Sequence, residues 1–519
     1  LGDVYKRQIQ LRPTFLGFEA AKTGVFASQK ALDIVGHNLS NINTEGYTRQ
    51  RVDQVAQYVN ASGARLKPDM VSLAGMGTYI EGVAQLRNER LDTAYRQENT
   101  NAGFYNQQSQ MFSDIESIIN ELEVGKDGNG YGLSFAIKDM YTALEDFAYN
   151  ASSEADANVF ANSVANVTQT LNRLSQNLTK SANQYKEELQ ITVEDVNAMM
   201  KDLAELNKSI RQSINTNGYT EQFGPNELKD QRNLLLDKLS SYGSLRVEEQ
   251  TDGTVTVELN GHKCVWGTEY DTINYQSNNN GTVQVNWKSN GENAAKDTGI
   301  FKAAADIING RGLGATSSTE STVNGFLYYQ DKLDAFASQL TVVLNNTIPD
   351  EVDADGNVLS YKKLVGETVE SETGYDVFPD MLTTAENINI TSDLMNDSSY
   401  LIDKNNSTDN TSLLELINKL TKDKHSFESA SYKFTGTFQE FVADYTGTLG
   451  SDNSYAEGRY KSSLSMINEI QNSRDEISGV SESEETVNMM TYNRAFQAAA
   501  RMMTVMDGLL DVVINQMAI

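Results

Sequence analysis

Apolar residues recur at alternating steps of three and four at both ends of the chain. Near the start, one polar residue interrupts a row made of Phe18, Ala21, Val25, Ser28, Leu32, Val35, Leu39 and Ile42. Near the end, the same spacing continues unbroken through Met489, Tyr492, Phe496, Ala499, Met503, Met506, Leu510, Val513 and Met517. A repeat of 3.5 residues is typical of two helices that stay in contact along their length. The pattern therefore predicts that the two ends pair as a coiled coil.

The length of the two rows bears on what covers them. At about 1.5 Å per residue, the first row spans about 37 Å and the second about 43 Å. A small globular core does not cover helices of that length, so we expect them to pack on each other or on neighbouring subunits. The alternative is that both are ordinary amphipathic helices of a compact domain, whose apolar stripe is simply core.

The interior of the chain contains further helical patterns. One heptad series consists of Tyr185, Leu189, Thr192, Val196, Met199, Leu203, Leu206 and Ile210, and an earlier one of Tyr105, Phe112, Ile115, Ile119 and Leu122. Another helix is expected after Gly224-Pro225, with Pro225 in its first turn. Helical spacing returns around 326–344 and 438–477. These segments predict a helical bundle.

After Gly243 the period changes from helical to two, which is the period of a strand. Val255, Val257 and Leu259 alternate with polar residues, and Asp252-Gly253 suits a hairpin turn. A second hairpin is expected to place Ile273 and Tyr275 opposite Val283, Val285 and Trp287. Residues 245–309 are therefore predicted to form a β-rich insertion.

Charge is distributed unevenly. The net charge is −29, which repels phosphate backbones and anionic membranes, so neither nucleic acid nor a membrane is an expected partner. Between Asp350 and Tyr400 the sequence contains twelve acidic residues, and its only basic residues are Lys362 and Lys363. We interpret this stretch as a solvated second insertion whose fold the pattern does not assign.

Cysteine content and hydropathy exclude several classes. Cys264 is the only cysteine, so neither an intrachain disulfide nor a cysteine-based metal site is possible. No run reaches the 18 or so apolar residues of a membrane helix, and Glu19 and Lys22 interrupt the candidate leader sequence. We expect a protein that is cytoplasmic or that leaves the cell without a cleaved signal peptide. Residues 1–10 fit no pattern.

No residue pattern indicates catalysis. His37, His262 and His425 are scattered and lie in no metal-binding motif, and phosphate-binding glycine loops are missing. We therefore predict no catalytic residues, no metal and no cofactor. Asp353-Ala-Asp355-Gly-Asn357 resembles the opening of a calcium loop, but its glycine comes two places early and Leu364 replaces the bidentate Glu. A turn in an acidic loop is the preferred interpretation.

A local motif ends the first apolar row. It contains Asn38, Asn41, Asn43, Thr44, Gly46 and Tyr47. Asn43 and Gly46 tolerate left-handed backbone angles, so the helix can stop and Tyr47 can pack back on its end. Taken alone, this is only a helix stop.

The motif and the far end of the chain together resemble one family. Residues 31–47 are similar to the N-terminal signature Asn-Asn-Leu-Ala-Asn-x-Asn-Thr-x-Gly-Tyr of the bacterial flagellar rod, hook and hook-associated proteins. Residues 478–501, with Ser478-Gly-Val-Ser481 and Ala495-Phe-Gln-Ala-Ala-Ala-Arg501, resemble the C-terminal helix of that family. Residues 230–240 and the following Asp252-Gly-Thr-Val255 resemble the helix-to-hairpin passage of its junction members. Glu482-Ser483 and Gly508 depart from the family pattern.

The resemblance implies a mainly α fold with a β-rich insertion, in an elongated multidomain axial protein with paired terminal helices, a helical bundle and an outer β domain. The expected division is 11–47 and 478–519 for the terminal coiled-coil domain, 48–244, 310–348 and 411–477 for the bundle, 245–309 for the β-rich insertion and 349–410 for the acidic insertion. The assembly interface would consist of Phe18, Val25, Leu32, Val35, Leu39, Ile42, Met489, Tyr492, Phe496, Met503, Met506, Leu510 and Val513.

The family also implies a function. The chain would be a structural subunit of the extracellular flagellum, exported by the type III route and polymerised as a homo-oligomeric ring between hook and filament. Its partners would be the flagellar hook protein, the second hook–filament junction protein and an export chaperone at the C-terminal helix. Two alternatives stay open: another axial protein of the hook or distal rod, and a secreted hydrolase or adhesin whose active part is 350–410.

Overall fold

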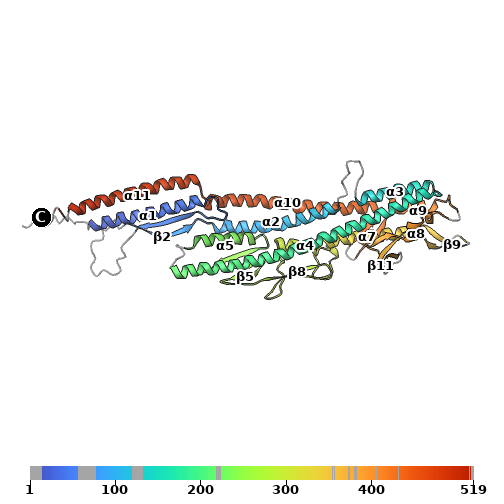
Figure 1. Ribbon diagram of the computed structural model, residues 1–519, viewed down its shortest axis with the longest axis horizontal. Coiled ribbons are helices and arrows are strands. Elements are labelled where there is room, and N and C mark those ends of the chain that lie inside the picture. The colour runs from blue at the N-terminus through green and yellow to red at the C-terminus, as the bar shows by residue number, and fades with distance from the viewer. Residues whose placement is uncertain are drawn as a thin grey trace, which may run out of the picture.

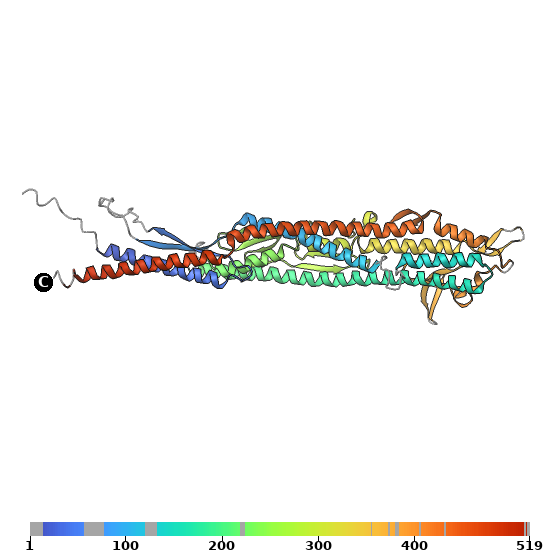
Figure 2. The same ribbon diagram turned by 90° about the horizontal axis from the view of Figure 1, so that it is seen from above.

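In the computed structural model the chain forms a long, narrow molecule whose helices run along one axis (Figures 1 and 2). The structure describes residues 14–56, 77–119, 132–217, 224–353, 355, 357–371, 374–378, 383–403, 406–429, 432–512 and 515. The first and last helices lie together at one end, and the strands of 349–378 lie at the other end. The chain therefore leaves the terminal helices, runs the length of the molecule and returns.

Helices make up most of the described chain. They are α1 (Thr14–Ser40), α2 (Glu89–Ile119), α3 (Leu133–Tyr149), α4 (Glu154–Asn217), α5 (Asn226–Leu239), α6 (Ile300–Ile308), α7 (Phe326–Asn345), α8 (Ser392–Asn396), α9 (Thr411–Thr421), α10 (Phe438–Ser478) and α11 (Glu482–Asp511). In the described part of the chain, the 3₁₀ turns η3 (Gly312–Gly314) and η4 (Ser398–Leu401) lie between α6 and α7 and between α8 and α9.

Helix α4 determines the length of the body. Its 64 residues contain neither proline nor glycine, and at about 1.5 Å per residue they extend about 96 Å. The predicted heptad series of 185–210 lies entirely within this helix, whereas that of 105–122 lies in α2 as far as Ile119. Pro225 stands just before α5 rather than in its first turn, so the helix begins one residue later than predicted.

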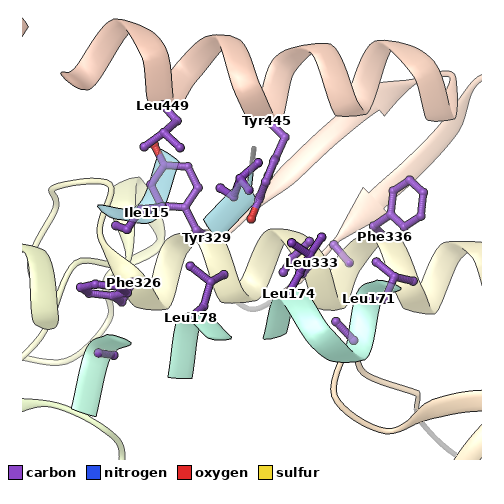
Figure 3. Packing of buried hydrophobic residues seen from close by; sticks show 14 of the residues in the cluster. Ile115, Leu171, Leu174, Leu178, Phe326, Tyr329, Leu333, Phe336, Tyr445 and Leu449 are labelled. Atoms are coloured by element: carbon purple, nitrogen blue, oxygen red, sulfur yellow. The ribbon is translucent and has the colours of Figure 1, made fainter. Parts of the chain in front are cut away.

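The bundle core forms where α2, α4, α7 and α10 meet (Figure 3). Its buried residues include Ile115, Leu171, Leu174, Leu178, Phe326, Tyr329, Leu333, Phe336, Tyr445 and Leu449. Lys332 is also fully buried there, because its Nζ lies 2.9 Å from a carboxylate oxygen of Asp444 and between the rings of Tyr328 and Tyr432. A buried charge is tolerated only when it is paired in this way.

The strands form small antiparallel sheets along the sides of the helices. They are β1 (Gln50–Ala56), β2 (Thr78–Gln85), β3 (Leu245–Glu249), β4 (Val255–Leu259), β5 (His262–Trp266), β6 (Glu269–Tyr270), β7 (Ile273–Ser277), β8 (Val283–Trp287), β9 (Pro349–Val352), β10 (Val358–Tyr361), β11 (Val365–Ser371), β12 (Gly374–Phe378), β13 (Ile388–Ile390), β14 (His425–Glu428) and β15 (Lys433–Gly436). The sheet orders are β1-β2, β3-β4-β5-β6, β7-β8, β10-β9, β12-β11-β13 and β14-β15.

Both predicted hairpins are confirmed. Gly253 turns the chain between β3 and β4 with φ +80°, and β7 pairs with β8 in the expected register, with Ile273 opposite Trp287 and Tyr275 opposite Val285. These strands occupy 245–287, whereas the following segment contains helix α6, which packs on α2. The acidic stretch contains the strands β9 to β13 and the short helix α8.

Asparagine side chains attach these strands to the helices. The amide of Asn207 on α4 bonds both the carbonyl and the N–H of Val255, at 2.9 and 3.1 Å, and Asn197 does the same to Ile273 at 2.9 and 2.7 Å. Asn309 clamps Val283 in the same way. Each asparagine thus bonds the first residue of a strand as a neighbouring strand would, because an amide offers the same donor and acceptor as a backbone.

Candidate assembly interface

Helices α1 and α11 lie side by side in antiparallel directions (Figures 1 and 2). Three contacts set the register: Met506 lies over Gly17, a Cβ built on Gly24 would be 3.5 Å from that of Ala499, and the Asn38 amide reaches Glu485 at 3.2 Å. From Gly17 to Gly24 the contact moves seven residues forward along α1 and seven residues back along α11. From Gly24 to Asn38 it moves fourteen residues forward along α1 and fourteen back along α11. The pairing therefore follows a heptad spacing.

The structure distributes the predicted residues of α1 over two faces. Ala21, Ser28 and Val35 are buried, as are Ala31 and Asn38, in the contact with α11 and the neighbouring hairpin. The predicted interface residues Phe18, Val25, Leu32 and Leu39 are half-buried, and Ile42 is 40% exposed beyond the helix end. The row nearest α11 contains Gly17, Gly24 and Ala31, small residues that periodicity of large apolar side chains does not reveal.

Helix α11 is poorly covered. Glu485 is the only buried residue among the 30 described residues of α11, and Met489 is 38% exposed. Tyr492, Phe496, Met503, Met506 and Leu510 are half-buried. Val513 lies outside the described residues. Packing on α1 thus leaves much of the apolar surface of α11 open.

The terminal helices join the body at a neck, which we define as Asn38 together with residues 47–50, 85–87 and 478–481. Asn38, 1% exposed, is its central residue: its Oδ1 accepts hydrogen bonds from the Tyr47 hydroxyl (2.8 Å) and the Gln50 N–H (3.0 Å), and its Nδ2 donates to the Gln50 carbonyl (2.9 Å). The same Nδ2 reaches Glu485 on α11. One buried amide therefore links α1, the first strand and α11.

The remaining helix-stop residues shape the turn after α1. Asn41 bonds the His37 carbonyl and Thr44 bonds Asn41, which closes the helix end. Gly46 has φ +79°, and an added Cβ would lie 3.1 Å from Leu234, so both backbone angle and space require glycine. Asn43 is exposed and is not left-handed, so its expected role in the turn was wrong.

Arg49 closes the neck on the other side. Its guanidinium lies 2.7 Å from Glu484 and 2.7 Å from Glu485, and its backbone N–H donates to the Ser478 carbonyl at 2.9 Å. The Glu485 side chain is 2% exposed, so its charge is paired where solvent is excluded. The first residues of α11 are thereby attached to the chain that follows α1.

Helix α5 supports the neck from below. The carboxylate of Asp230 accepts hydrogen bonds from Gln85 (2.8 Å) and the Thr48 N–H (3.3 Å). Burial raises the pKa of Asp230 to about 6, although the hydrogen bonds from Thr48 and the charge of Arg87 act in the opposite direction. Burial and the nearby Asp230 also raise the pKa of Tyr47, which remains a neutral donor to Asn38.

An alternating ion network connects α2, α5 and α10 beside the neck. Arg474 lies 2.9 Å from Asp92 and 2.7 Å from Asp237, and its guanidinium stacks 4.4 Å from the centre of the Tyr95 ring. Arg87 pairs with the second oxygen of Asp92, and Arg96 pairs with the second oxygen of Asp237. All five charged groups are mostly buried, so the end of α10 is held firmly against the body.

The described residues give no support for catalysis. Ser289, Asp271 and His262 lie close together, but the Ser289 hydroxyl donates to Asp271 (2.5 Å) and so does not face the imidazole that would have to activate it. Asp353 accepts hydrogen bonds from the N–H groups of Asp355 and Asn357, which confirms the acidic turn. In the described segments, no group of His, Cys, Asp and Glu is arranged to hold a metal, and no helix is long and apolar enough to cross a membrane.

Family models match both ends and the middle of the chain. The flagellar hook-associated protein FlgK helical domain matches 112–360, the flagellar basal body rod FlgEFG protein C-terminal model matches 471–517, and the flagella basal body rod protein model matches 18–48. The chain contains a FlgK family helical domain between two segments that match flagellar rod and hook families. The two terminal matches include Asn38 and neck residues 47–48 and 478–481, and the helical-domain match covers much of the body.

Relatives and a solved structure agree with this assignment. Flagellar hook-associated protein 1 of Bacillus subtilis is 29% identical over 98% of this chain and 99% of its own length. The protein of the same name in Salmonella typhimurium is 26% identical over 48% of this chain and 42% of its own length. The flagellar hook junction protein FlgK from Burkholderia pseudomallei has a similar fold, with a TM-score of 0.52, 12% identity, and coverage of 76% of this chain and all of that one.

Proposed function

We propose that this hook-associated protein is a structural subunit of the bacterial flagellum that polymerises at the distal end of the hook and joins the hook to the filament. The observation that carries the proposal is the terminal pair: two helices from opposite ends of the chain, matched by rod and hook family models, whose apolar surface one molecule covers only in part. Burial of that surface in a polymer would stabilise the assembly.

The division of labour within the chain follows from its shape. We propose that residues 11–47 and 478–519 form a coiled coil toward the inside of the assembly, and that the bundle and the β-rich segments 245–309 and 349–410 lie progressively farther out. The net charge of −29 suits solvated outer parts, since like charges keep neighbouring surfaces apart. The interface would use the predicted residues of α1 and α11, most of which are half-buried in the single chain.

The partners belong to the same proposal. The subunit would form a homo-oligomeric ring, contact the hook protein on one side and the second hook–filament junction protein on the other, and be exported to the extracellular flagellum. A chaperone on α11 before export would cover its exposed Met502 and Val505. Methionine suits a surface that must fit several partners, because its unbranched side chain adapts to irregular contacts.

The rival functions receive less support. The relatives carry the name of the hook-associated protein rather than of a hook or rod protein, which disfavours another axial role. A hydrolase or adhesin would need convergent polar groups around 350–410, and the polar contacts described there are turns and strand clamps such as that of Asn345 on Val365.

Deletion of the gene tests the proposed function. We expect hooks of normal length without filaments, and filament subunits in the culture medium, because the adaptor between them is missing. The wild-type gene supplied in trans should restore filaments and motility. Loss of the hook itself would instead indicate a rod or hook protein, and intact filaments would contradict the proposal altogether.

A further inference from the structure

A second apolar row follows α11 on a face that α1 does not cover. It consists of Ala495, Ala498, Met502, Val505, Leu509 and Val512, which we name the outer row. The residues are separated by alternating steps of three and four, and all are exposed, with Met502 at 46%, Val505 at 59% and Leu509 at 50%. This spacing is the one that packs against another helix, and it is not the row that α11 turns toward α1.

Helix α1 carries a complementary row. Phe18, Val25, Leu32 and Leu39 recur every seven residues and stay half-buried beside the contact with α11. At about 1.5 Å per residue, this row is about 31 Å long and the outer row about 26 Å, so their lengths match. Each copy of the chain therefore presents two different apolar rows on two different helices.

The two rows lie on opposite sides of the helix pair. Each residue advances about 100° around a helix. Going around α1 in the direction in which its chain winds, Leu32 comes after the contact residues Ser28 and Ala31. Going around α11 in the direction in which its chain winds, Met502 comes before the contact residues Ala499 and Met503. In an antiparallel pair these opposite senses of rotation direct the rows to opposite sides. Two unlike surfaces on opposite sides produce a head-to-tail contact, which closes into a ring or continues as a helix.

We infer that the outer row of α11 docks on the Phe18, Val25, Leu32 and Leu39 row of α1 in a second copy of this chain. The inference rests on the proposed function and assigns its subunit contact to particular residues. Both rows consist of apolar residues in a chain that carries a net charge of −29, so at this contact neighbouring copies meet without juxtaposing like charges. The contact is also continuous with the α1–α11 interface, so the burial of one extends the other.

Site-specific photo-crosslinking tests the contact. Cys264 is fully buried, so a cysteine placed on α11 can be labelled selectively with a benzophenone maleimide. The test variant is Met502→Cys, and the matched control is Met490→Cys, also an exposed methionine of α11 (51%) but about 120° away around the helix. Full-length protein is assembled on hooks in the deletion strain, irradiated, and analysed by mass spectrometry.

The expected product joins two copies, with the label of Met502→Cys attached to residues between Phe18 and Leu39, and the yield at least tenfold above that of Met490→Cys. Equal yields, or crosslinks from Met502→Cys to a different protein or back to its own α1, would overturn the inference. In the same strain, the double change Met502→Gln and Leu509→Gln should reduce filament-bearing cells at least tenfold, and Met490→Gln should leave their number unchanged.

These arms separate the two proposals. If the wild-type gene restores filaments but the double variant restores them equally well, the assigned contact is wrong while the adaptor function stands. If the wild-type gene fails to restore filaments to hook-bearing cells, the proposed function itself fails.

Discussion

Asn38 illustrates how much depends on single polar residues at the neck. Its amide makes four hydrogen bonds, to Tyr47, to both backbone groups of Gln50 and to Glu485. Truncation leaves the two buried backbone groups of Gln50 without these partners, whereas Glu485 keeps Arg49 and the Tyr47 hydroxyl keeps His37. Each buried group that loses its partner costs roughly 1–3 kcal/mol. The helix-stop motif is therefore more than a helix stop, because it also fastens the terminal pair to the body.

We expect Asn38→Ala to destabilise the neck by at least about 2 kcal/mol. Hydrogen–deuterium exchange of the peptides that cover 47–50 and 482–488 should accelerate on this change. Asn43→Ala, in the same motif but exposed, is the control and should leave exchange unchanged. Equal effects of the two variants would contradict the role assigned to Asn38.

Asp230 makes the neck sensitive to pH. Its pKa rises from an ordinary 3.8 to about 6 on burial, so the folded neck binds the proton more tightly than the open one. The stability it contributes is complete below about pH 4 and is lost as pH rises through about 6. At about 1.4 kcal/mol per pKa unit, the loss is on the order of 3 kcal/mol.

The Asp230→Asn variant, which does not titrate, should lack this pH dependence. Exchange protection of 47–50 in the wild type, divided by that of the variant at the same pH, should fall about tenfold or more between pH 4 and pH 7. Asp33→Asn on the exposed face of α1 provides the comparison and should give a constant ratio. A ratio that rises with pH would show that the sign is wrong.

At the scale of elements, glycine substitutions test the pairing of α1 with α11. A Cβ on Gly24 would already lie 3.5 Å from Ala499, so the further carbons of Gly24→Leu should overpack the contact and cost about 1–3 kcal/mol. Gly508 has nothing within 4 Å of an added Cβ, so Gly508→Leu should instead gain about 1 kcal/mol of helix propensity. Exchange rates along α11 measure both, and two stabilising changes would refute the pairing.

The elements that could be predicted from sequence are those with a clear period. The heptads of α4, the alternation of β4 and the turn at Gly253 each determine local structure through one repeating rule. The row of α1 nearest α11 was less visible, because Gly17, Gly24 and Ala31 contribute by being small rather than apolar. The asparagine clamps of Asn197 and Asn207 could not be found at all, since they depend on strands that lie far away in the sequence.

At the scale of the whole molecule, burial decreases from the body to the terminal pair. The bundle contains a continuous core, whereas α11 has a single buried residue among its described residues, Glu485. Because few buried contacts mean a small free energy of local opening, the ends should open far more often than the body in an isolated subunit.

Limited proteolysis of the free monomer should therefore remove residues before about 50 and after about 480 and leave one resistant fragment. The same ends should become resistant in assembled junctions, where neighbouring copies would cover α11. The fragments can be identified by intact mass. Resistance at both ends of the monomer would show that the terminal pair is already stable alone.

The chain enters and leaves the body through the same neck. All residues beyond the neck therefore form one insertion between α1 and α11. Residues added or removed at the far tip, around β9 and β10, alter neither the register of α1 against α11 nor the hydrogen bond from Arg49 to Ser478. Evolution, or an engineer, can thus vary what such a subunit displays to its surroundings while the polymerising end stays the same.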